Sequence, residues 1–109
     1  MAIKTTAIFK KSFKKLLKKD RDLIHEYEKL LNDLEKDSDL GTLLGDGRYK
    51  IRLINKANNK GKSAGYRVIT YTKIEDTILL VYIYSKGDIE NISEHKIDQV
   101  IINYKSDIF

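Results

Sequence analysis

The 109-residue chain contains no cysteine, no proline and no tryptophan. Without cysteine there can be no disulfide framework, thiol nucleophile or Cys-ligated zinc. The only histidines are His25 and His95, so a His-rich metal site is not expected. No apolar run approaches the ~20 residues of a membrane helix, and the basic N-terminus lacks the apolar segment of a secretory signal. These absences predict an intracellular protein with no cofactor, no metal and no membrane partner.

The length fits a single domain, which we place at residues 1–109. The formal net charge of +5 favours an anionic partner. That charge is unevenly distributed, because residues 1–21 carry eight basic side chains and one acidic one, and residues 47–73 carry eight basic and none acidic. A run of charge is most often a solvated face. The block at 47–73 is less easily explained that way, because it falls in predicted strands.

The first half of the chain predicts a short edge strand followed by two helices. Residues 2–5 form the strand, and Thr6 has the hydroxyl of a helix N-cap. Apolar residues at helical spacing follow on both sides of Asp20, which we interpret as the second N-cap, at the hinge of an antiparallel helical hairpin. Glycines between residues 41 and 47 then indicate a loop.

The second half predicts three strands and a last helix. Apolar and basic residues alternate over 48–53, and further strands are expected at 65–71 and 78–84. Asn91 or Ser93 is the expected cap of the last helix. The order β-α-α-β-β-β-α predicts an α+β fold: a small, mostly antiparallel sheet with the helical hairpin on one face and a C-terminal helix.

Three segments within residues 45–86 carry a resemblance to a known family. They read G-D-G-R-Y-K-I-R-L, G-K-S-A-G-Y-R-V-I-T-Y and I-L-L-V-Y-I-Y-S-K. Their order and spacing resemble the RelE/ParE superfamily of toxins from bacterial type II toxin–antitoxin modules, closest to the HigB-like branch. Ala64 and Thr70 depart from the pattern of that branch, and neither departure removes a charged group.

The resemblance implies a RelE-like fold and a cytoplasmic endoribonuclease, or mRNA interferase, that cuts mRNA in the ribosomal A site. It also implies a cognate antitoxin, with a helix-turn-helix DNA-binding region, that silences the toxin. Members of the ParE branch bind DNA gyrase instead, so a non-catalytic gyrase inhibitor is the alternative. A plain RNA-binding module is a third hypothesis.

Metal-free RNA cleavage needs a base at the attacking 2′-oxygen, an acid at the leaving oxygen and positive charge around the phosphate. Strand alternation puts Lys50 and Arg52 on one face, and a meander would bring Arg67 and Lys86 toward them. We therefore predict these four as the catalytic residues. Arg67 is the expected phosphate clamp because guanidinium binds phosphate bidentately. Lys50 or Lys86 is the expected proton-exchanging group.

The predicted RNA contacts lie beside this set or in the loop that leads to it. They are Arg48, Lys56, Lys60, Lys62, Tyr66 and Tyr84. The tyrosines could stack on bases, although packing is the commoner use of tyrosine in a sheet. No His, Asp or Glu lies in the basic block, so the usual acid–base pair is missing there. The G-K-S-A-G segment is not a nucleotide-binding P-loop, because it lacks the full spacing and precedes a strand.

Overall fold

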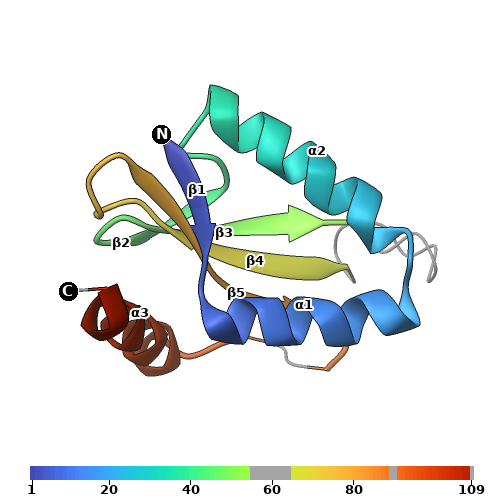
Figure 1. The fold of residues 1–109 in the computed structure, drawn as a ribbon. Helices are drawn as coiled ribbons and strands as arrows, with labels where there is room; N and C mark the ends of the chain where they lie inside the picture. The colour runs from blue at the N-terminus through green and yellow to red at the C-terminus, as the bar shows by residue number, and fades with distance from the viewer. Residues whose placement is uncertain (55–64, 89–90, 109) are drawn as a thin grey trace.

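The computed structural model describes residues 1–54, 65–88 and 91–108, and it confirms the α+β class (Figure 1). The elements in chain order are β1 (Ala2–Thr5), α1 (Ala7–Lys19), α2 (Leu23–Lys36), β2 (Thr42–Gly45), β3 (Arg48–Leu53), β4 (Tyr66–Tyr71), β5 (Thr77–Ser85) and α3 (Glu94–Ile108). Within the described residues, no helix is long and apolar enough to cross a membrane.

The sheet has five strands in the order β1-β5-β4-β3-β2. β1 is parallel to β5, and every other neighbouring pair is antiparallel. Alternation along the strands sends Val68 into a core beneath α1 and α2, and Ile69 into a second core beneath α3. β5 contributes to both cores, which explains its nearly continuous apolar sequence.

The two N-terminal helices meet near Asp20, as predicted. Thr6 caps α1, because its hydroxyl accepts a hydrogen bond from the Phe9 amide at 3.0 Å. Asp20, however, closes α1 and does not cap α2, since its backbone N–H donates to the Leu16 carbonyl and Asp22 is the N-cap of α2. The Asp20 carboxylate accepts two hydrogen bonds, from the Asp22 backbone N–H at 3.1 Å and from the buried Tyr66 hydroxyl at 2.8 Å. Asp20 therefore satisfies a backbone N–H just ahead of α2, but it lies two residues before Asp22, the N-cap of that helix.

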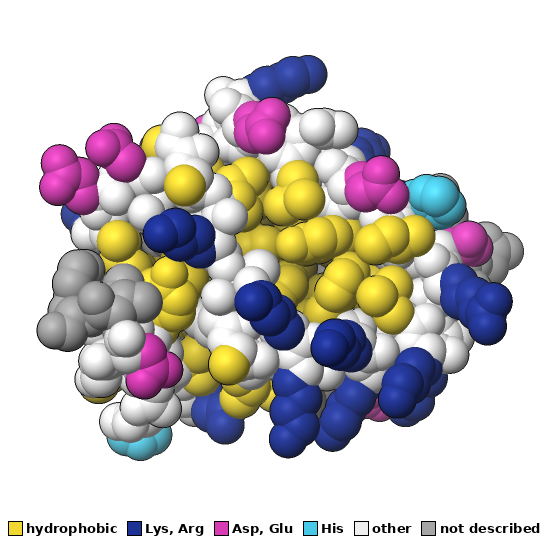
Figure 2. Space-filling model, viewed as in Figure 1, with side chains coloured by type: hydrophobic (Ala, Val, Ile, Leu, Met, Phe, Trp, Pro, Cys, Tyr) yellow, Lys and Arg dark blue, Asp and Glu magenta, His cyan; other side chains and the backbone are white. Residues whose placement is uncertain are grey.

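From this hinge, α1 and α2 open as a V across the sheet (Figure 1). Partly buried apolar side chains pack between them, including Phe13, Leu17, Tyr27 and Leu31. The rings of Phe13 and Tyr27 lie 4.5 Å apart between centroids. Figure 2 shows apolar side chains exposed along the V, with Lys and Arg below them on the α1 side and acidic groups above on the α2 side. We call this surface the hairpin groove.

The glycine-rich segment predicted as a loop is a strand and a tight turn. β2 pairs with β3 from Thr42 opposite Lys50 to Gly45 opposite Arg48. The connecting residues Asp46 and Gly47 have φ values of +51° and +78°. Positive φ at both central positions is typical of the type I′ turn, for which Asp-Gly is a favoured sequence. The pair therefore joins two strands, and the resulting hairpin fixes the start of β3.

α3 packs on the sheet face opposite the helical hairpin, through Ile97, Val100 and Ile101. Ser93 is its N-cap, because the Ser93 hydroxyl accepts a hydrogen bond from the Lys96 amide at 3.1 Å. This decides between the two predicted caps. Asn91 lies in the lead-in to the helix, and its side chain is available for a different contact.

Candidate nucleic-acid interface

Three of the four predicted catalytic residues lie together on the sheet face that α3 partly covers. Arg52 pairs with Arg67 across β3 and β4, and Arg67 pairs with Tyr84 across β4 and β5. Lys50 occupies the adjacent row of the sheet, opposite Ile69. Directly paired residues of antiparallel strands project to the same side, so these side chains share one surface. We call Lys50, Arg52, Arg67 and Tyr84 the cationic face.

Arg67 is the most buried cation of this face, with 4% of its surface exposed. Its Nη1 donates to the Tyr66 carbonyl at 3.2 Å. Burial lowers the pKa of Arg67, and the nearby positive charge of Arg52 lowers it further. Guanidinium stays protonated in proteins, so the two positive charges repel each other across the strands. An anion bound beside them would relieve that repulsion.

Tyr84 borders Arg67 and is 3% exposed. Its ring packs edge-on against Tyr82, with 6.2 Å between centroids. The Tyr84 hydroxyl is buried, and none of the described residues meets the distance and angle criteria for a hydrogen bond to it. Burial raises the pKa of this hydroxyl, while the nearby Ile92 backbone and the Arg67 charge partly oppose the shift. The phenol is therefore protonated at neutral pH and can act as a donor.

The two predicted lysines occupy different surroundings. The Lys50 ammonium donates to Asn91 Oδ1 at 3.5 Å, a long contact that links β3 to the lead-in of α3. Lys86 immediately follows β5, and its backbone N–H donates to the Gly65 carbonyl at 2.9 Å. Its backbone thus continues the line of β5 beyond Tyr84, beside the start of β4.

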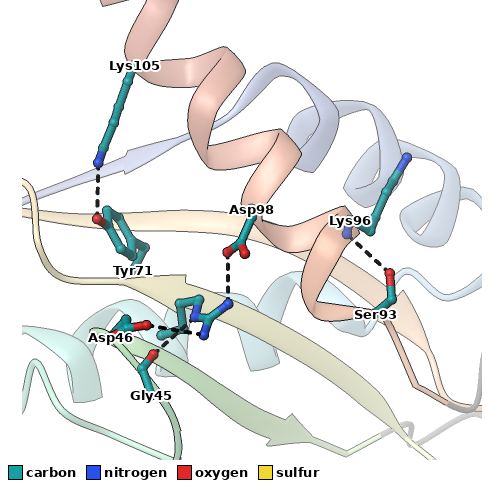
Figure 3. A network of polar contacts seen from close by, with 8 residues as sticks. Gly45, Asp46, Tyr71, Ser93, Lys96, Asp98 and Lys105 are labelled. Carbon is teal, nitrogen blue, oxygen red and sulfur yellow. Dashed lines mark hydrogen bonds and ion pairs between the residues drawn. The ribbon is translucent and has the colours of Figure 1, made fainter.

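Two of the predicted RNA contacts have other partners. Tyr66 projects into the core beneath α1 and α2, on the opposite side of the sheet from Arg67. Burial and the Asp20 carboxylate raise the pKa of its hydroxyl. Arg48 shares the face of Lys50, but its Nη1 donates to Asp98 Oδ1 at 2.8 Å. Figure 3 shows Asp98 reaching down from α3 to this contact. Lys56, Lys60 and Lys62 lie outside the described residues.

Sequence comparison supports the relationship that the strand segments indicated. A family model described as the RelE toxin of the RelE/RelB toxin–antitoxin system matches residues 1–105. The chain belongs to the RelE toxin family. The match includes both N-terminal helices and most of α3, beyond the three strand segments. No curated protein matches the chain closely.

Three side chains that bind predicted site residues were not themselves predicted as functional. Asp98 binds Arg48, Asn91 contacts Lys50, and Asp20 accepts from Tyr66. The partners are separated by 50, 41 and 46 positions in the chain. No local pattern marks such pairs, because their proximity follows from the docking of α3 and of the helical hairpin on the sheet.

The groups on the cationic face define what the RelE-family toxin can do chemically. Guanidinium groups bind phosphate, ammonium groups balance charge or exchange protons, and a phenol donates a hydrogen bond. Within residues 1–54, 65–88 and 91–108, no cluster of three or more His, Cys, Asp or Glu side chains is placed to hold a metal ion. The described surface is therefore suited to a phosphate-bearing partner.

Proposed function

We propose that this RelE-family toxin inhibits translation as a ribosome-dependent mRNA endonuclease. The supporting observation is the cross-strand pair of Arg52 and Arg67, with Lys50 in the neighbouring row. Burial, and to a lesser extent the nearby Arg52, lowers the pKa of Arg67, and a guanidinium beside a second cation is suited to bind a phosphate. Within the family we place the chain nearest the HigB-like branch, on the strength of residues 45–86.

In the proposed reaction, the 2′-hydroxyl of mRNA attacks the adjacent phosphate. A bond forms between the 2′-oxygen and phosphorus, and the bond from phosphorus to the 5′-oxygen breaks. Arg67 clamps the phosphate and, with Arg52, stabilises the charge that develops on its oxygens. Lys50 or Lys86 takes or returns the proton. The products are a 2′,3′-cyclic phosphate and a 5′-hydroxyl, and no metal takes part.

The cationic face has few groups for acid–base catalysis, and we propose that the ribosome compensates by positioning the mRNA. The Tyr84 hydroxyl has a raised pKa, so it cannot serve as a base at neutral pH. No acidic residue lies within residues 47–73. An enzyme with few acid–base groups gains most from a substrate that is held in a reactive geometry. Translating ribosomes hold mRNA in this way, which places the activity in the cytoplasm.

We further propose that a cognate RelB-type antitoxin, with a helix-turn-helix DNA-binding region, docks in the hairpin groove. The groove offers apolar side chains of the kind that receive an amphipathic helix. Lys11, Lys14 and Lys18 of α1 are exposed. They favour an acidic segment on the antitoxin. Because the groove and the cationic face lie on opposite sides of the sheet, docking there would silence the toxin by excluding it from the ribosome.

The proposal is tested by adding purified toxin to a short mRNA, either free or bound to ribosomes, and in parallel to a gyrase supercoiling assay. We expect cleavage of the ribosome-bound mRNA, little cleavage of the free mRNA and no effect on supercoiling. Inhibition of supercoiling without RNA cleavage would instead establish the ParE-like activity.

A further inference from the structure

We propose that Arg48 and Asp98 form a positioning pair that sets the start of α3 above Lys50, and that Arg48 does not contact RNA. The proposal rests on the proposed nuclease function. Arg48 is 8% exposed, although its charge would suit an RNA contact. Its Nη1 lies 2.8 Å from Asp98 Oδ1, its Nε donates to the Gly45 carbonyl at 3.0 Å, and its Nη2 lies 3.8 Å from Asp46. All three guanidinium nitrogens are therefore engaged.

These contacts fix the position of α3 along the sheet. The apolar contacts of α3 decide which side of the helix faces the sheet, but apolar packing alone is non-directional and tolerates small shifts along the helix axis. A charge-assisted hydrogen bond is directional, so the bond between Arg48 and Asp98 fixes that shift. A second polar contact lies nearer the C-terminal end of α3, where the Lys105 Nζ is 3.1 Å from the Tyr71 hydroxyl of β4 (Figure 3).

The position of α3 determines what surrounds Lys50. Arg48 and Lys50 are two residues apart on β3 and project to the same face. Asp98 of α3 contacts Arg48, and Asn91, in the lead-in to α3, contacts Lys50. A shift of α3 would therefore move Asn91 away from the Lys50 ammonium. It would also move the Ile92 backbone that lies near Tyr84.

The two members of the pair make opposite predictions under the two roles of Arg48. If Arg48 binds phosphate, Asp98 repels RNA, and Asp98→Asn should preserve or improve binding and activity. If the pair positions α3, Asp98→Asn and Arg48→Gln should damage turnover alike. The Asp98 side chain is 52% exposed, so neither neutralisation leaves a fully buried carboxylate without its partner.

The experiment compares Arg48→Gln with Arg52→Gln, a matched loss of charge from the same face of β3. Affinity for ribosomes carrying a short mRNA is measured from about 50 to 200 mM KCl at fixed magnesium. Loss of a phosphate contact lowers the slope of log affinity against log salt by about 0.7 for a single strand. We expect the slope to fall by this amount for Arg52→Gln and to stay unchanged for Arg48→Gln.

In the same preparation, we expect Arg48→Gln and Asp98→Asn each to lower kcat about 10- to 100-fold, with little change in KM. The double variant should be no slower than the slower single variant, and Asp98→Glu should recover most of the activity. A lowered salt slope for Arg48→Gln, or full activity for Asp98→Asn, would overturn the proposal.

Hydrogen exchange provides a readout that does not depend on cleavage. We expect faster exchange of the amides at the start of α3 in Arg48→Gln and Asp98→Asn, with the β3–β4 amides unchanged. If the wild-type protein did not cleave ribosome-bound mRNA, the proposed function would be wrong. Hydrogen exchange and the salt slope would still test whether Arg48 and Asp98 position α3. Unchanged exchange at the start of α3 would contradict the positioning role whatever the activity.

Discussion

At the scale of single residues, burial and charge separate the basic side chains into different roles. Arg67 is buried beside another cation, whereas Arg48 is buried beside an acid. A guanidinium paired with a carboxylate within the protein is already neutralised and has a structural use. Arg67 lies opposite a second guanidinium, that of Arg52, and an anion between the two would interact favourably with both. That difference points to Arg67, and not Arg48, as the phosphate clamp.

Replacing Arg67 with alanine should relieve growth inhibition. Loss of one preorganised cation should remove about 2–4 kcal/mol of transition-state stabilisation, which lowers kcat about 30- to 1,000-fold. The measurement is growth after induction, together with cleavage of ribosome-bound mRNA. Arg21→Ala is the matched control, because Arg21 is exposed at the helical hinge. A folded Arg67→Ala protein, judged by its thermal melt, that remained as toxic as the control would count against the assigned site.

Replacing Tyr66 with phenylalanine should reduce stability by about 1.5–3 kcal/mol, because Asp20 loses a charge-assisted hydrogen bond in a buried setting. Since folding raises the pKa of Tyr66, its contribution is complete below pH ~10, where tyrosine is protonated in the unfolded chain. It declines as the pH rises further. Chemical denaturation from pH 7 to 11 measures both effects. The variant should lose stability less steeply above pH 10, and an equally steep decline would refute this account.

At the scale of elements, local sequence patterns predicted most of the fold. Apolar spacing identified the helices, alternation identified β3, and the apolar run of β5 correctly indicated an interior strand. β2 was not predicted because the glycines around it are typical of a loop, although Asp46–Gly47 between short strands is the sequence of a tight turn. The hinge cap was placed two residues too early: Asp20 accepts from the Asp22 backbone N–H, but Asp22 is the N-cap of α2.

For the candidate site, the sequence predicted which side chains share a face of the sheet but not which partners they bind. Alternation alone placed Lys50 and Arg52 on one face, and the observed register adds Arg67 to it. Alternation also places Tyr66 on the opposite side of the sheet from its neighbour Arg67, which argues against the prediction that Tyr66 contacts RNA. The partners of Arg48 and Lys50 could not be predicted, because they depend on how α3 docks on the sheet.

The lysines of α1 give the element-scale prediction. Changing Lys11, Lys14, Lys15 and Lys18 to glutamine should slow association with the cognate antitoxin and weaken its salt dependence, because complementary charge accelerates encounter. Stopped-flow mixing at several salt concentrations measures this. A matched control changes four exposed lysines elsewhere, Lys4, Lys36, Lys73 and Lys96. Equal rates and equal salt dependence in the two variants would show that α1 does not steer the antitoxin.

At the scale of the whole molecule, the sheet separates two surfaces with different chemistry. One side carries the hairpin groove, which is apolar and edged by lysines on α1 (Figure 2). The other carries the cationic face, bounded by α3. A partner that recognises apolar side chains and a partner that carries phosphates can therefore be bound through different surfaces. This arrangement suits a toxin whose inhibitor must act without imitating its RNA substrate.

The most direct test of the central claim is the chemistry of the cut RNA ends. Toxin expression is induced briefly in cells with active ribosomes, and the new mRNA ends are mapped and treated with end-specific enzymes. If the cationic face promotes attack by the 2′-hydroxyl, the upstream fragments will end in a 2′,3′-cyclic or 3′-phosphate and the downstream fragments will begin with a 5′-hydroxyl. Arg67→Ala should lack these ends. Toxin-dependent cuts that carry 5′-phosphates would contradict the mechanism.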